Sequence, residues 1–187
     1  MQLWHHHANA YISLGSNLGD RAGNLLLAIR GLREASFEIC KLSGIYETEP
    51  VGLDTDKAFL NMVAEVRVTD VTPSQMMARL LRIEYNLGRG DKSVKKPRTA
   101  DLDILFFGSE QLESEFLTIP HPRTHLRRFV LVPMQEIAPE FIHPSLEKTI
   151  TQLLEECEDE SWINRWDPNE GLLGMDDHFS FAPVPAE

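Results

Sequence analysis

PRTADLDILFF, residues 97–107, is the stretch of the sequence that decides the fold. A basic turn introduced by proline passes into a run of aliphatic and aromatic residues, which predicts a buried strand. Side chains alternate between the two faces of a strand, so the two aspartates are expected on the same face. The expected faces are Asp101, Asp103, Leu105 and Phe107 on one side, and Leu102, Ile104 and Phe106 on the other.

Asp101 and Asp103 indicate a cation site where this strand begins. Two carboxylates about 7 Å apart on one face repel each other and are costly to desolvate. A hard cation offsets that cost, and oxygen-only ligands suit Mg²⁺ held together with substrate phosphates. Arg98 precedes the pair and could hold the same phosphates. A D-x-D pair is short and common, however, and on its own it describes a solvated strand end at least as well.

The length and composition predict one globular domain. A chain of 187 residues can bury a core but is short for two catalytic domains. We expect the domain at residues 1–166 and an acidic tail with proline and glycine at 167–187. No apolar run approaches the roughly 20 residues of a membrane span, and the first ten residues lack the order of a secretory signal. Because the sequence has only two cysteines, a reducing cytoplasm is the expected compartment.

The net charge of −11 is unevenly distributed. An acidic chain is not expected to bind nucleic acid or an anionic membrane surface. Two segments carry a local positive charge, and cations concentrated in this way can bind a polyphosphate such as ATP. Their cationic residues are Arg89, Lys92, Lys95, Lys96 and Arg98 in one segment, and His121, Arg123, His125, Arg127 and Arg128 in the other.

Hydrophobic periodicity predicts alternating strands and helices. Predicted strands cover residues 10–14, 37–46, 59–69, 101–107 and 116–119; predicted helices follow the turn at 15–20 as far as 35 and cover 73–87, 127–137 and 146–156. As far as residue 107, the order is the ferredoxin-like β-α-β-β-α-β plan of an α+β protein. Because both faces of the 101–107 strand are apolar, we expect this core to be elaborated into a three-layer α/β/α sandwich.

Three polar residues stand out at this stage. Asn61 shares a strand face with Phe59, and a buried amide must be hydrogen-bonded either to the backbone or to a ligand. The ring of Phe59 could stack on a ligand. Glu84 lies late on the 73–87 helix and is expected at the surface. His121 lies between two prolines, which favour extended backbone and an oriented side chain.

Several ordered segments resemble the 6-hydroxymethyl-7,8-dihydropterin pyrophosphokinase family, whose members transfer diphosphate from ATP to a pterin alcohol in the folate pathway. The matching segments are YISLGSN (11–17), YET and PVG (46–48 and 50–52), FLN (59–61), RIE (82–84), PRTADLDI (97–104), PHP (120–122), and Arg127 with Phe129. They occur in the family's order from about residue 10 to residue 155. No single segment carries the resemblance, whereas the shared order does.

The resemblance implies a role for each matching residue. The residues implied to bind two Mg²⁺ ions that bridge the ATP phosphates are Asp101 and Asp103. The residues implied to enclose and hydrogen-bond the pterin are Thr48, Val51, Phe59, Asn61 and Phe129. The residues implied to hold the triphosphate are Arg98, His121 and Arg127, with Glu84, Ile104 and Thr118 lining the nucleotide site. The catalytic set is therefore Arg98, Asp101, Asp103, His121 and Arg127.

The chain departs from the family pattern at three positions. Lys95 lies in a segment where members often carry Trp and Arg, and Lys96 replaces a common Gly. Phe116 stands where some relatives have Arg. The segment 89–96 is expected to be a mobile lid, and lysine supplies a point charge rather than a bidentate contact. Its closure over ATP is therefore expected to differ from that in the family.

The sequence predicts a Mg²⁺-dependent diphosphotransferase acting on ATP and 6-hydroxymethyl-7,8-dihydropterin. A cytoplasmic monomer without nucleic-acid or membrane partners is expected. One alternative is a ferredoxin-like RNA-binding module, which would need exposed aromatic residues on its central strands and a basic sheet face. A second is a D-x-D nucleotide-sugar transferase, which usually needs a much larger domain. A third is an inactive relative, against which Arg98, Asp101, Asp103 and His121 argue.

Overall fold

The computed structural model describes residues 7–51, 55, 57–88 and 99–168. The strands in this part are β1 (His7–Ser16), β2 (Glu38–Leu42), β3 (Tyr46–Thr48), β4 (Phe59–Thr69), β5 (Asp101–Phe107), β6 (Leu112–Glu113), β7 (Thr118–Ile119) and β8 (Ile163–Arg165). The helices are α1 (Arg21–Glu34), α2 (Pro73–Asn86), the 3₁₀ turn η1 (Thr124–Leu126), α3 (Arg128–Ile137) and α4 (Ile150–Glu155). No helix in the described part is long and apolar enough to cross a membrane.

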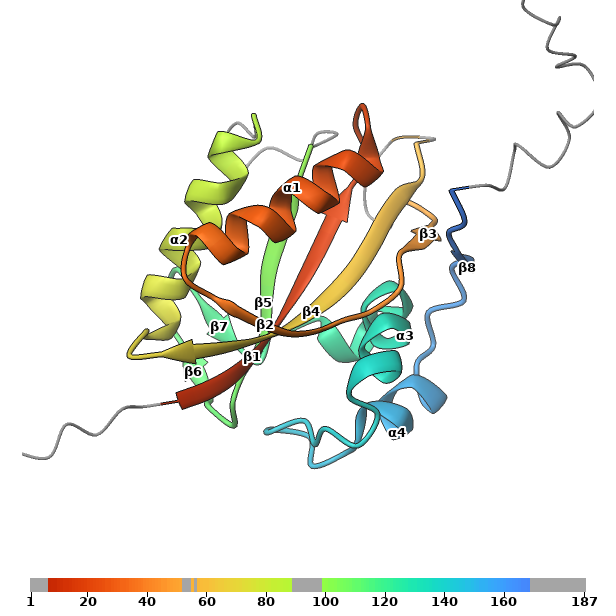
Figure 1. The fold of residues 1–187 in the computed structure, drawn as a ribbon. Coiled ribbons are helices and arrows are strands. Elements are labelled where there is room, and N and C mark those ends of the chain that lie inside the picture. The colour runs from red at the N-terminus through yellow and green to blue at the C-terminus, as the bar shows by residue number, and fades with distance from the viewer. Residues whose placement is uncertain (1–6, 52–54, 56, 89–98, 169–187) are drawn as a thin grey trace, which may run out of the picture.

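One antiparallel sheet organises the molecule (Figure 1). Its strand order is β5-β1-β4-β3-β8, and β2 also pairs with β4. In this order β1 lies between β4 and β5, as the ferredoxin-like plan requires. The predicted α+β fold class is therefore confirmed. The short strands β6 and β7 pair separately.

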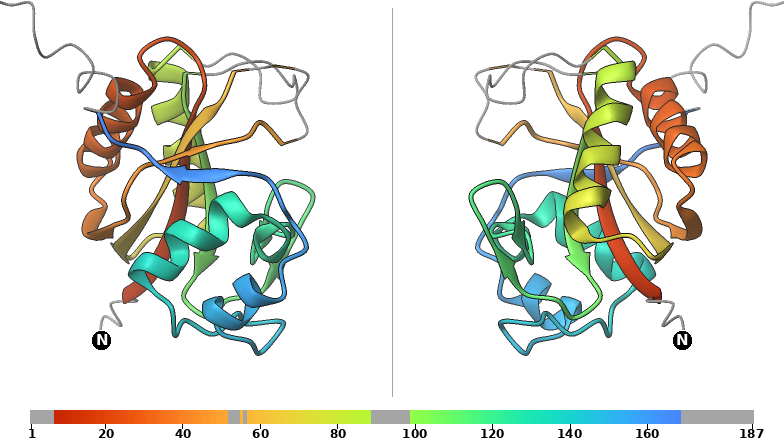
Figure 2. Two further views of the ribbon diagram at one scale, coloured as in Figure 1. Left: turned by 90° about the vertical axis from the view of Figure 1, so that its right-hand side faces the viewer. Right: turned by 90° about the vertical axis from the view of Figure 1, so that its left-hand side faces the viewer.

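Helices cover both faces of this sheet. Figure 2 shows α1 on one side of the strands and α3 with α4 on the other. The core beneath α1 and α2 includes Ile12, Leu14, Leu25, Leu32, Leu80 and Leu102. The core beneath α3 and α4 includes Val63, Leu105, Phe106, Leu131, Met134 and Leu153. The expected three-layer sandwich is therefore confirmed.

The expected alternation in β5 is wrong beyond Ile104. Tyr11 pairs with Phe106, whereas the next residue of β1, Ile12, pairs with Ile104. Leu105 is therefore an extra residue, a β-bulge, and it reverses the faces that follow. Phe106 joins the core beneath α3, and Phe107 joins the core beneath α1 and α2.

The predicted strand 37–46 is two strands in the structure. Ser43 interrupts it, because its hydroxyl oxygen accepts a 2.9 Å hydrogen bond from Val63 N–H in place of a backbone acceptor. Side chains of this kind compete with regular ladders. The first part becomes β2, and the second becomes β3 after Gly44. The predicted turn at 15–20 also begins later than expected, because Gly15 belongs to β1.

Several boundaries in the second half differ from the predictions. The helix expected at 146–156 begins only at Ile150, because Thr149 forms a capping box with Gln152. The strand expected at 116–119 is limited to Thr118–Ile119. The strands β6 and β8 and the turn η1 were not predicted. The expected lid at 89–96 lies outside the described residues.

Candidate active site

A cavity of about 440 Å³ opens on the α3 side of the sheet. The structure describes twelve of the thirteen predicted site residues, and eleven of these line the cavity; the exception is Glu84. The eleven are Thr48, Val51, Phe59, Asn61, Asp101, Asp103, Ile104, Thr118, His121, Arg127 and Phe129. Strands β3, β4, β5 and β7 and the start of α3 supply nine of them, and Val51 and His121 lie in the segments that follow β3 and β7. The fold therefore gathers residues that are up to 81 positions apart in the chain, from Thr48 to Phe129.

Asp101 and Asp103 are brought to one wall of the cavity by the start of β5. In the antiparallel register Asp101 lies opposite Gly15, and Asp103 lies opposite Ser13. Both aspartates are partly buried. They share a face as predicted, because the bulge at Leu105 comes after them. Their carboxylates add negative charge to a half-enclosed space, where a cation is favoured.

The donor atoms on this wall fit a magnesium ion shared with a polyphosphate. In the part of the chain that the structure describes, no group of three or more His, Cys, Asp or Glu side chains is arranged to hold a metal. A closed protein site, such as structural zinc requires, is therefore not formed by these residues. Magnesium is commonly held by one or two carboxylates together with phosphates and water. The pair Asp101 and Asp103 matches that requirement.

The floor of the cavity is built around Asn61 on β4. Asn61 Nδ2 donates a 2.7 Å hydrogen bond to Thr48 Oγ1, and both residues are buried. In the neighbouring strand Gly15 lies opposite Asn61. A Cβ atom at Gly15 would lie only 2.7 Å from Asn61 Oδ1 and 3.8 Å from Phe59 Cδ1. Glycine therefore provides the room in which the amide and the adjacent ring are placed.

Arg127 and Phe129 lie at the beginning of α3. The guanidinium carbon of Arg127 is 5.4 Å from the centroid of the Phe129 ring, a cation–π distance. Phe129 and Phe59 both line the cavity, as does Arg127. The arrangement places a permanent positive charge beside aromatic surface. A ligand with a flat ring and an anionic extension could use both.

His121 is held by its own backbone and by the turn that follows it. Its backbone N–H donates to Leu105 O at 2.9 Å, and its Nδ1 accepts from Arg123 N–H at 3.2 Å. Burial lowers the pKa of His121 below its ordinary value; Asp103 acts in the opposite direction, and Arg127 lowers the pKa further. The neutral imidazole therefore carries its proton on Nε2, because Nδ1 is an acceptor. These two hydrogen bonds orient His121 in addition to the predicted effect of its flanking prolines.

Glu84 is not at the surface as expected. It is 2% exposed, and its Oε1 accepts a 2.7 Å hydrogen bond from Leu102 N–H. The reason is that α2 packs beside β5, which is an edge strand of the sheet. The outer N–H groups of an edge strand need partners outside the sheet, and the carboxylate of Glu84 supplies one between the two aspartates. Arg98 lies outside the described residues.

Some cavity residues were not identified from the sequence. Gly15 was assigned to a turn, although an isolated glycine in a strand pattern signals a close approach. Glu49 also lines the cavity and directly follows β3. Phe116 lines the rim and is 84% exposed on the turn between β6 and β7. No local pattern distinguishes Glu49 from an ordinary loop acid.

The comparisons with known proteins agree with this geometry. A family model described as 7,8-dihydro-6-hydroxymethylpterin-pyrophosphokinase (HPPK) matches residues 11–139. The chain is 46% identical over 129 residues to the 2-amino-4-hydroxy-6-hydroxymethyldihydropteridine pyrophosphokinase of Bacillus subtilis. The aligned region covers 68% of this chain and 77% of that protein. It is 40% identical over 149 residues to the folic acid synthesis protein fol1 of Pneumocystis carinii, covering 80% of this chain and 20% of that protein.

A solved structure shares the fold. Wild-type HPPK-DHPS of Plasmodium falciparum, crystallised with pteroate, matches with a TM-score of 0.64 at 18% identity. The match covers 83% of this chain and 43% of that chain. The chain therefore spans most of the B. subtilis protein but less than half of the Pneumocystis and Plasmodium proteins.

Proposed function

The chain belongs to the 7,8-dihydro-6-hydroxymethylpterin-pyrophosphokinase family, and we propose that it transfers diphosphate from ATP to the hydroxymethyl group of 6-hydroxymethyl-7,8-dihydropterin. The products are AMP and the pterin diphosphate, as a step in folate synthesis. One observation carries the proposal: a single cavity is lined by an aspartate pair, an arginine, two phenylalanines and a buried amide. A polyphosphate needs cations and their ligands, and a flat heterocycle needs aromatic faces with polar groups at its edge.

The transfer forms one oxygen–phosphorus bond and breaks another. The hydroxymethyl oxygen attacks the β-phosphorus of ATP, and the bond between that phosphorus and the oxygen bridging to the α-phosphate breaks. AMP leaves with the electron pair, and the hydroxyl proton is lost to solvent. Reactions of this kind need little covalent participation by the protein. Alignment of the two substrates and neutralisation of the developing charge supply most of the catalysis.

Asp101 and Asp103 are the proposed ligands of Mg²⁺, with two ions expected. When bound, Mg²⁺ neutralises charge on the bridging and leaving oxygens. Arg127 supplies a fixed positive charge for the phosphates, and His121 supplies a neutral Nε2–H donor. Arg98 has the same proposed role and lies outside the described residues.

The pterin is assigned to the part of the cavity near β3, β4 and the start of α3. Phe59 and Phe129 supply aromatic surface, and Asn61 supplies a hydrogen-bonding edge group. The amide is already oriented by Thr48, so little conformational entropy is lost when the ring binds. The other proposed contacts are Val51 for the pterin and Glu84, Ile104 and Thr118 for the nucleotide. Glu84 accepts a hydrogen bond from Leu102 N–H. This contact supports an indirect role for Glu84, in which it fixes the position of β5.

The domain organisation and assembly are part of the same proposal. We infer one domain at residues 1–166 and a tail at 167–187, in a cytoplasmic monomer. Pairing of β8 with β3 brings the sheet as far as Arg165, and Trp166 packs against the core beneath α1 and α2. Cys40 and Cys157 are free thiols, which suits a reducing compartment. Light scattering on the purified full chain would test the monomer directly.

The test of the function is identification of the nucleotide product. The full chain is incubated with MgATP and 6-hydroxymethyl-7,8-dihydropterin, and nucleotides are separated by chromatography. We expect AMP to form in a one-to-one ratio with the pterin diphosphate and only when the pterin is present. Formation of ADP would indicate transfer of a single phosphoryl group, and the absence of pterin-dependent ATP consumption would contradict the proposal.

A further inference from the structure

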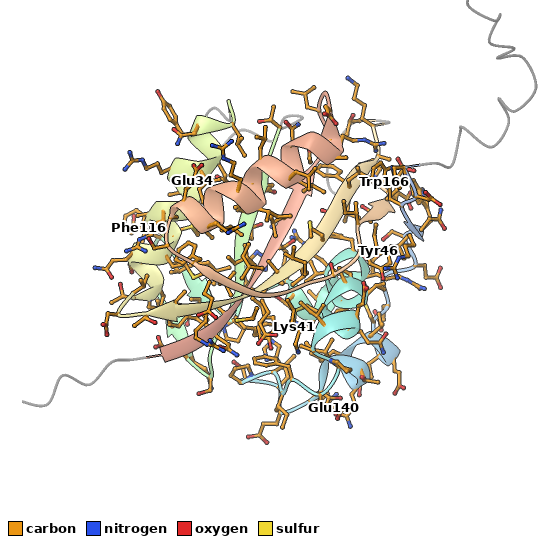
Figure 3. All side chains as sticks on the ribbon, in the orientation of Figure 1. Glu34, Lys41, Tyr46, Phe116, Glu140 and Trp166 are labelled. Atoms are coloured by element: carbon orange, nitrogen blue, oxygen red, sulfur yellow. The ribbon has the colours of Figure 1, made fainter. Side chains whose placement is uncertain are left out.

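A segment near the end of the described chain contacts both walls of the cavity. We call residues 159–166 the C-terminal strap; they lie beyond residue 139, where the family match ends. The strap passes from the beginning of α3 to β3 and ends with Trp166 N–H donating to Ile45 O at 2.9 Å. Figure 3 shows Tyr46 of β3 and Trp166 of the strap on the same side of the molecule.

The first contact of the C-terminal strap is with the N-terminus of α3. Arg127, the N-cap residue of this helix, makes no side-chain capping bond. Asp159 takes that role, since its Oδ2 accepts a 2.9 Å hydrogen bond from Arg128 N–H. Asp159 is itself fixed, because its Oδ1 accepts from the backbone and hydroxyl of Ser161. A carboxylate at this position satisfies a helix N–H and complements the helix dipole. The same contact fixes the first turn of α3, which contains Phe129.

The second contact is with the opposite wall. The middle of the C-terminal strap, β8, pairs with β3 so that Ile163 lies opposite Thr48. Just before this pairing, Glu49 N–H donates to Trp162 O at 3.2 Å, and Trp162 N–H donates to Glu49 Oε2 at 3.3 Å. Thr48 and Glu49 both line the cavity. The strap therefore backs the wall that holds the Asn61 amide.

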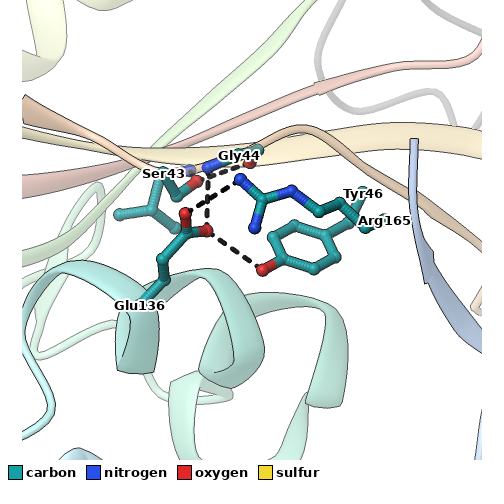
Figure 4. Close-up of polar contacts among 6 residues, drawn as sticks. Ser43, Gly44, Tyr46, Glu136 and Arg165 are labelled. Carbon is teal, nitrogen blue, oxygen red and sulfur yellow. Dashed lines mark hydrogen bonds and ion pairs between the residues drawn. The ribbon is translucent and has the colours of Figure 1, made fainter. Parts of the chain in front are cut away.

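A polar cluster joins these two contacts (Figure 4). Glu136 of α3 accepts from Tyr46 Oη at 3.0 Å and from Gly44 N–H at 2.8 Å, and it pairs with Arg165 Nη2 at 3.3 Å. Gly44 leaves room for the guanidinium, since a Cβ there would lie 2.9 Å from Arg165 Nη2. Helix α3, strand β3 and the C-terminal strap are thus linked through one carboxylate.

We propose that the C-terminal strap is a positioning element of the active site, which sets the separation between the α3 wall and the β3 wall, with Asp159 as its main positioning residue. The inference rests on the proposed function, because the space between these walls is taken as the pterin site. Asp159 does not line the cavity and acts through Arg128 N–H. Such indirect effects can be large, because a misplacement of about 1 Å can cost about 100-fold in rate.

The test compares Asp159→Ala with Glu158→Ala in the full chain. Glu158 is the adjacent acid and is exposed, so its removal changes the charge equally without removing the cap. We expect the dissociation constant for 6-hydroxymethyl-7,8-dihydropterin, measured by calorimetry at a temperature where each variant is folded, to rise at least fivefold in Asp159→Ala and less than twofold in Glu158→Ala. Asp159→Asn keeps an acceptor oxygen and should recover most of the affinity. Equal pterin affinities in folded Asp159→Ala and Glu158→Ala would overturn the proposal, even if the melting temperature fell.

A measurement on the unaltered chain guards against a variant that does not fold. Amide hydrogen exchange is followed with and without saturating pterin. We expect slower exchange at Arg128 and Glu49, two amides that donate to the C-terminal strap, when pterin is bound. Unchanged exchange at both amides would overturn the proposal. If the unaltered chain binds no pterin, the proposed function fails; if it binds pterin but Asp159→Ala does so equally well, only the strap inference fails.

Discussion

At the scale of single residues, the polar groups of the cavity are held by partners before any ligand arrives. Asn61 is oriented by Thr48, and His121 is oriented by Arg123 N–H. Such preorganisation lowers the cost of ordering side chains during binding and reaction. The aspartates on β5 are placed by the strand itself. The effect of a substitution here therefore depends on the contact that holds the residue as much as on its own chemistry.

Replacing Asp103 with Asn should abolish most of the metal-dependent transfer. The amide keeps the size of the side chain but removes the negative charge of a proposed magnesium ligand. We expect kcat/KM to fall by at least about 100-fold, the scale of losing a charge-stabilising group. AMP production at saturating MgATP measures the effect, with Glu113→Gln, an exposed acid on β6, as the control. Turnover close to that of the unaltered chain would contradict the metal assignment.

Replacing Gly15 with Ala should weaken pterin binding. The added methyl group would lie 2.7 Å from Asn61 Oδ1, so the amide must move from its position beside Thr48. We expect a dissociation constant for the pterin about tenfold higher, equivalent to about 1.4 kcal/mol. The affinity for a non-hydrolysable MgATP analogue, measured alone, should change much less. Unchanged pterin affinity would show that the close approach of Gly15 to Asn61 has no functional consequence.

At the scale of elements, the position of β5 explains why the aspartates need a third acid behind them. β5 is an edge strand, and edge strands present backbone groups that the sheet does not satisfy. The Glu84 carboxylate of α2 accepts from Leu102 N–H, between Asp101 and Asp103 but on the other side of the sheet. A helix thereby fixes the strand that carries the proposed metal ligands.

Replacing Glu84 with Ala should therefore destabilise the fold as well as the site. Removing the acceptor leaves the Leu102 N–H without this partner, which costs about 2 kcal/mol. Glu84→Gln retains an acceptor oxygen and should cost less. Urea denaturation measures both variants, with Arg82→Ala as a control because Arg82 is exposed on the same helix. If Glu84→Ala were as stable as Arg82→Ala, the hydrogen bond would not support β5.

The elements themselves show what the sequence can and cannot predict. The bounds of β4 follow from local alternation, and the helix predicted at 73–87 is confirmed as α2. The capping box of α2, between Thr72 and Gln75, also lies within a few residues of local sequence. The bulge at Leu105 depends on pairing with β1, which no local pattern contains. The burial of Glu84 depends on which strand is at the edge of the sheet. Strand β8 forms only because β3 offers it a partner.

The site follows the same division. Asp101, Asp103, Phe59 and Asn61 could be identified from strand pattern and residue type, and the structure places all four at one cavity. A glycine in a strand pattern signals a close approach, but its partner here, Asn61, could not be identified because it depends on how β1 pairs with β4. Contacts between distant segments, such as the one between Asp159 and Arg128, lie beyond any reading of local sequence.

At the scale of the whole molecule, the C-terminal strap joins the layers of the sandwich. One of its ends contacts the helix layer that borders the cavity, and Trp166 packs against the core on the opposite face of the sheet. The described chain thus ends on the side of the sheet away from its active site. Stability of the whole fold should respond when either end of the strap is altered.

The stabilising effect of Asp159 should depend on pH. Burial alone would raise the pKa of Asp159, but hydrogen bonds from Ser161 and from Arg128 N–H lower it below the ordinary value. Because the folded-state pKa is below the unfolded value of about 3.9, the ionised group stabilises the fold above that pH, and its contribution is lost as pH falls through the folded-state pKa. The difference in unfolding free energy between the unaltered chain and Asp159→Asn should therefore be constant near neutral pH and shrink below about pH 4. Urea titrations across this range would measure it, and a difference independent of pH would contradict the assignment.

The register across β5, β1 and β4 has a consequence for the spacing of the residues that line the cavity. Asp101, Gly15 and Asn61 lie in one row across three neighbouring strands. Neighbouring strands are about 4.8 Å apart, so the backbones of Asp101 and Asn61 are about 10 Å apart. Main-chain pairing fixes this distance between the two backbones, and a change of side-chain rotamer does not alter it. If the pterin binds beside Asn61 and the metal beside Asp101, as proposed above, the sheet itself sets the distance between the two substrates, and side-chain substitutions leave that distance unchanged.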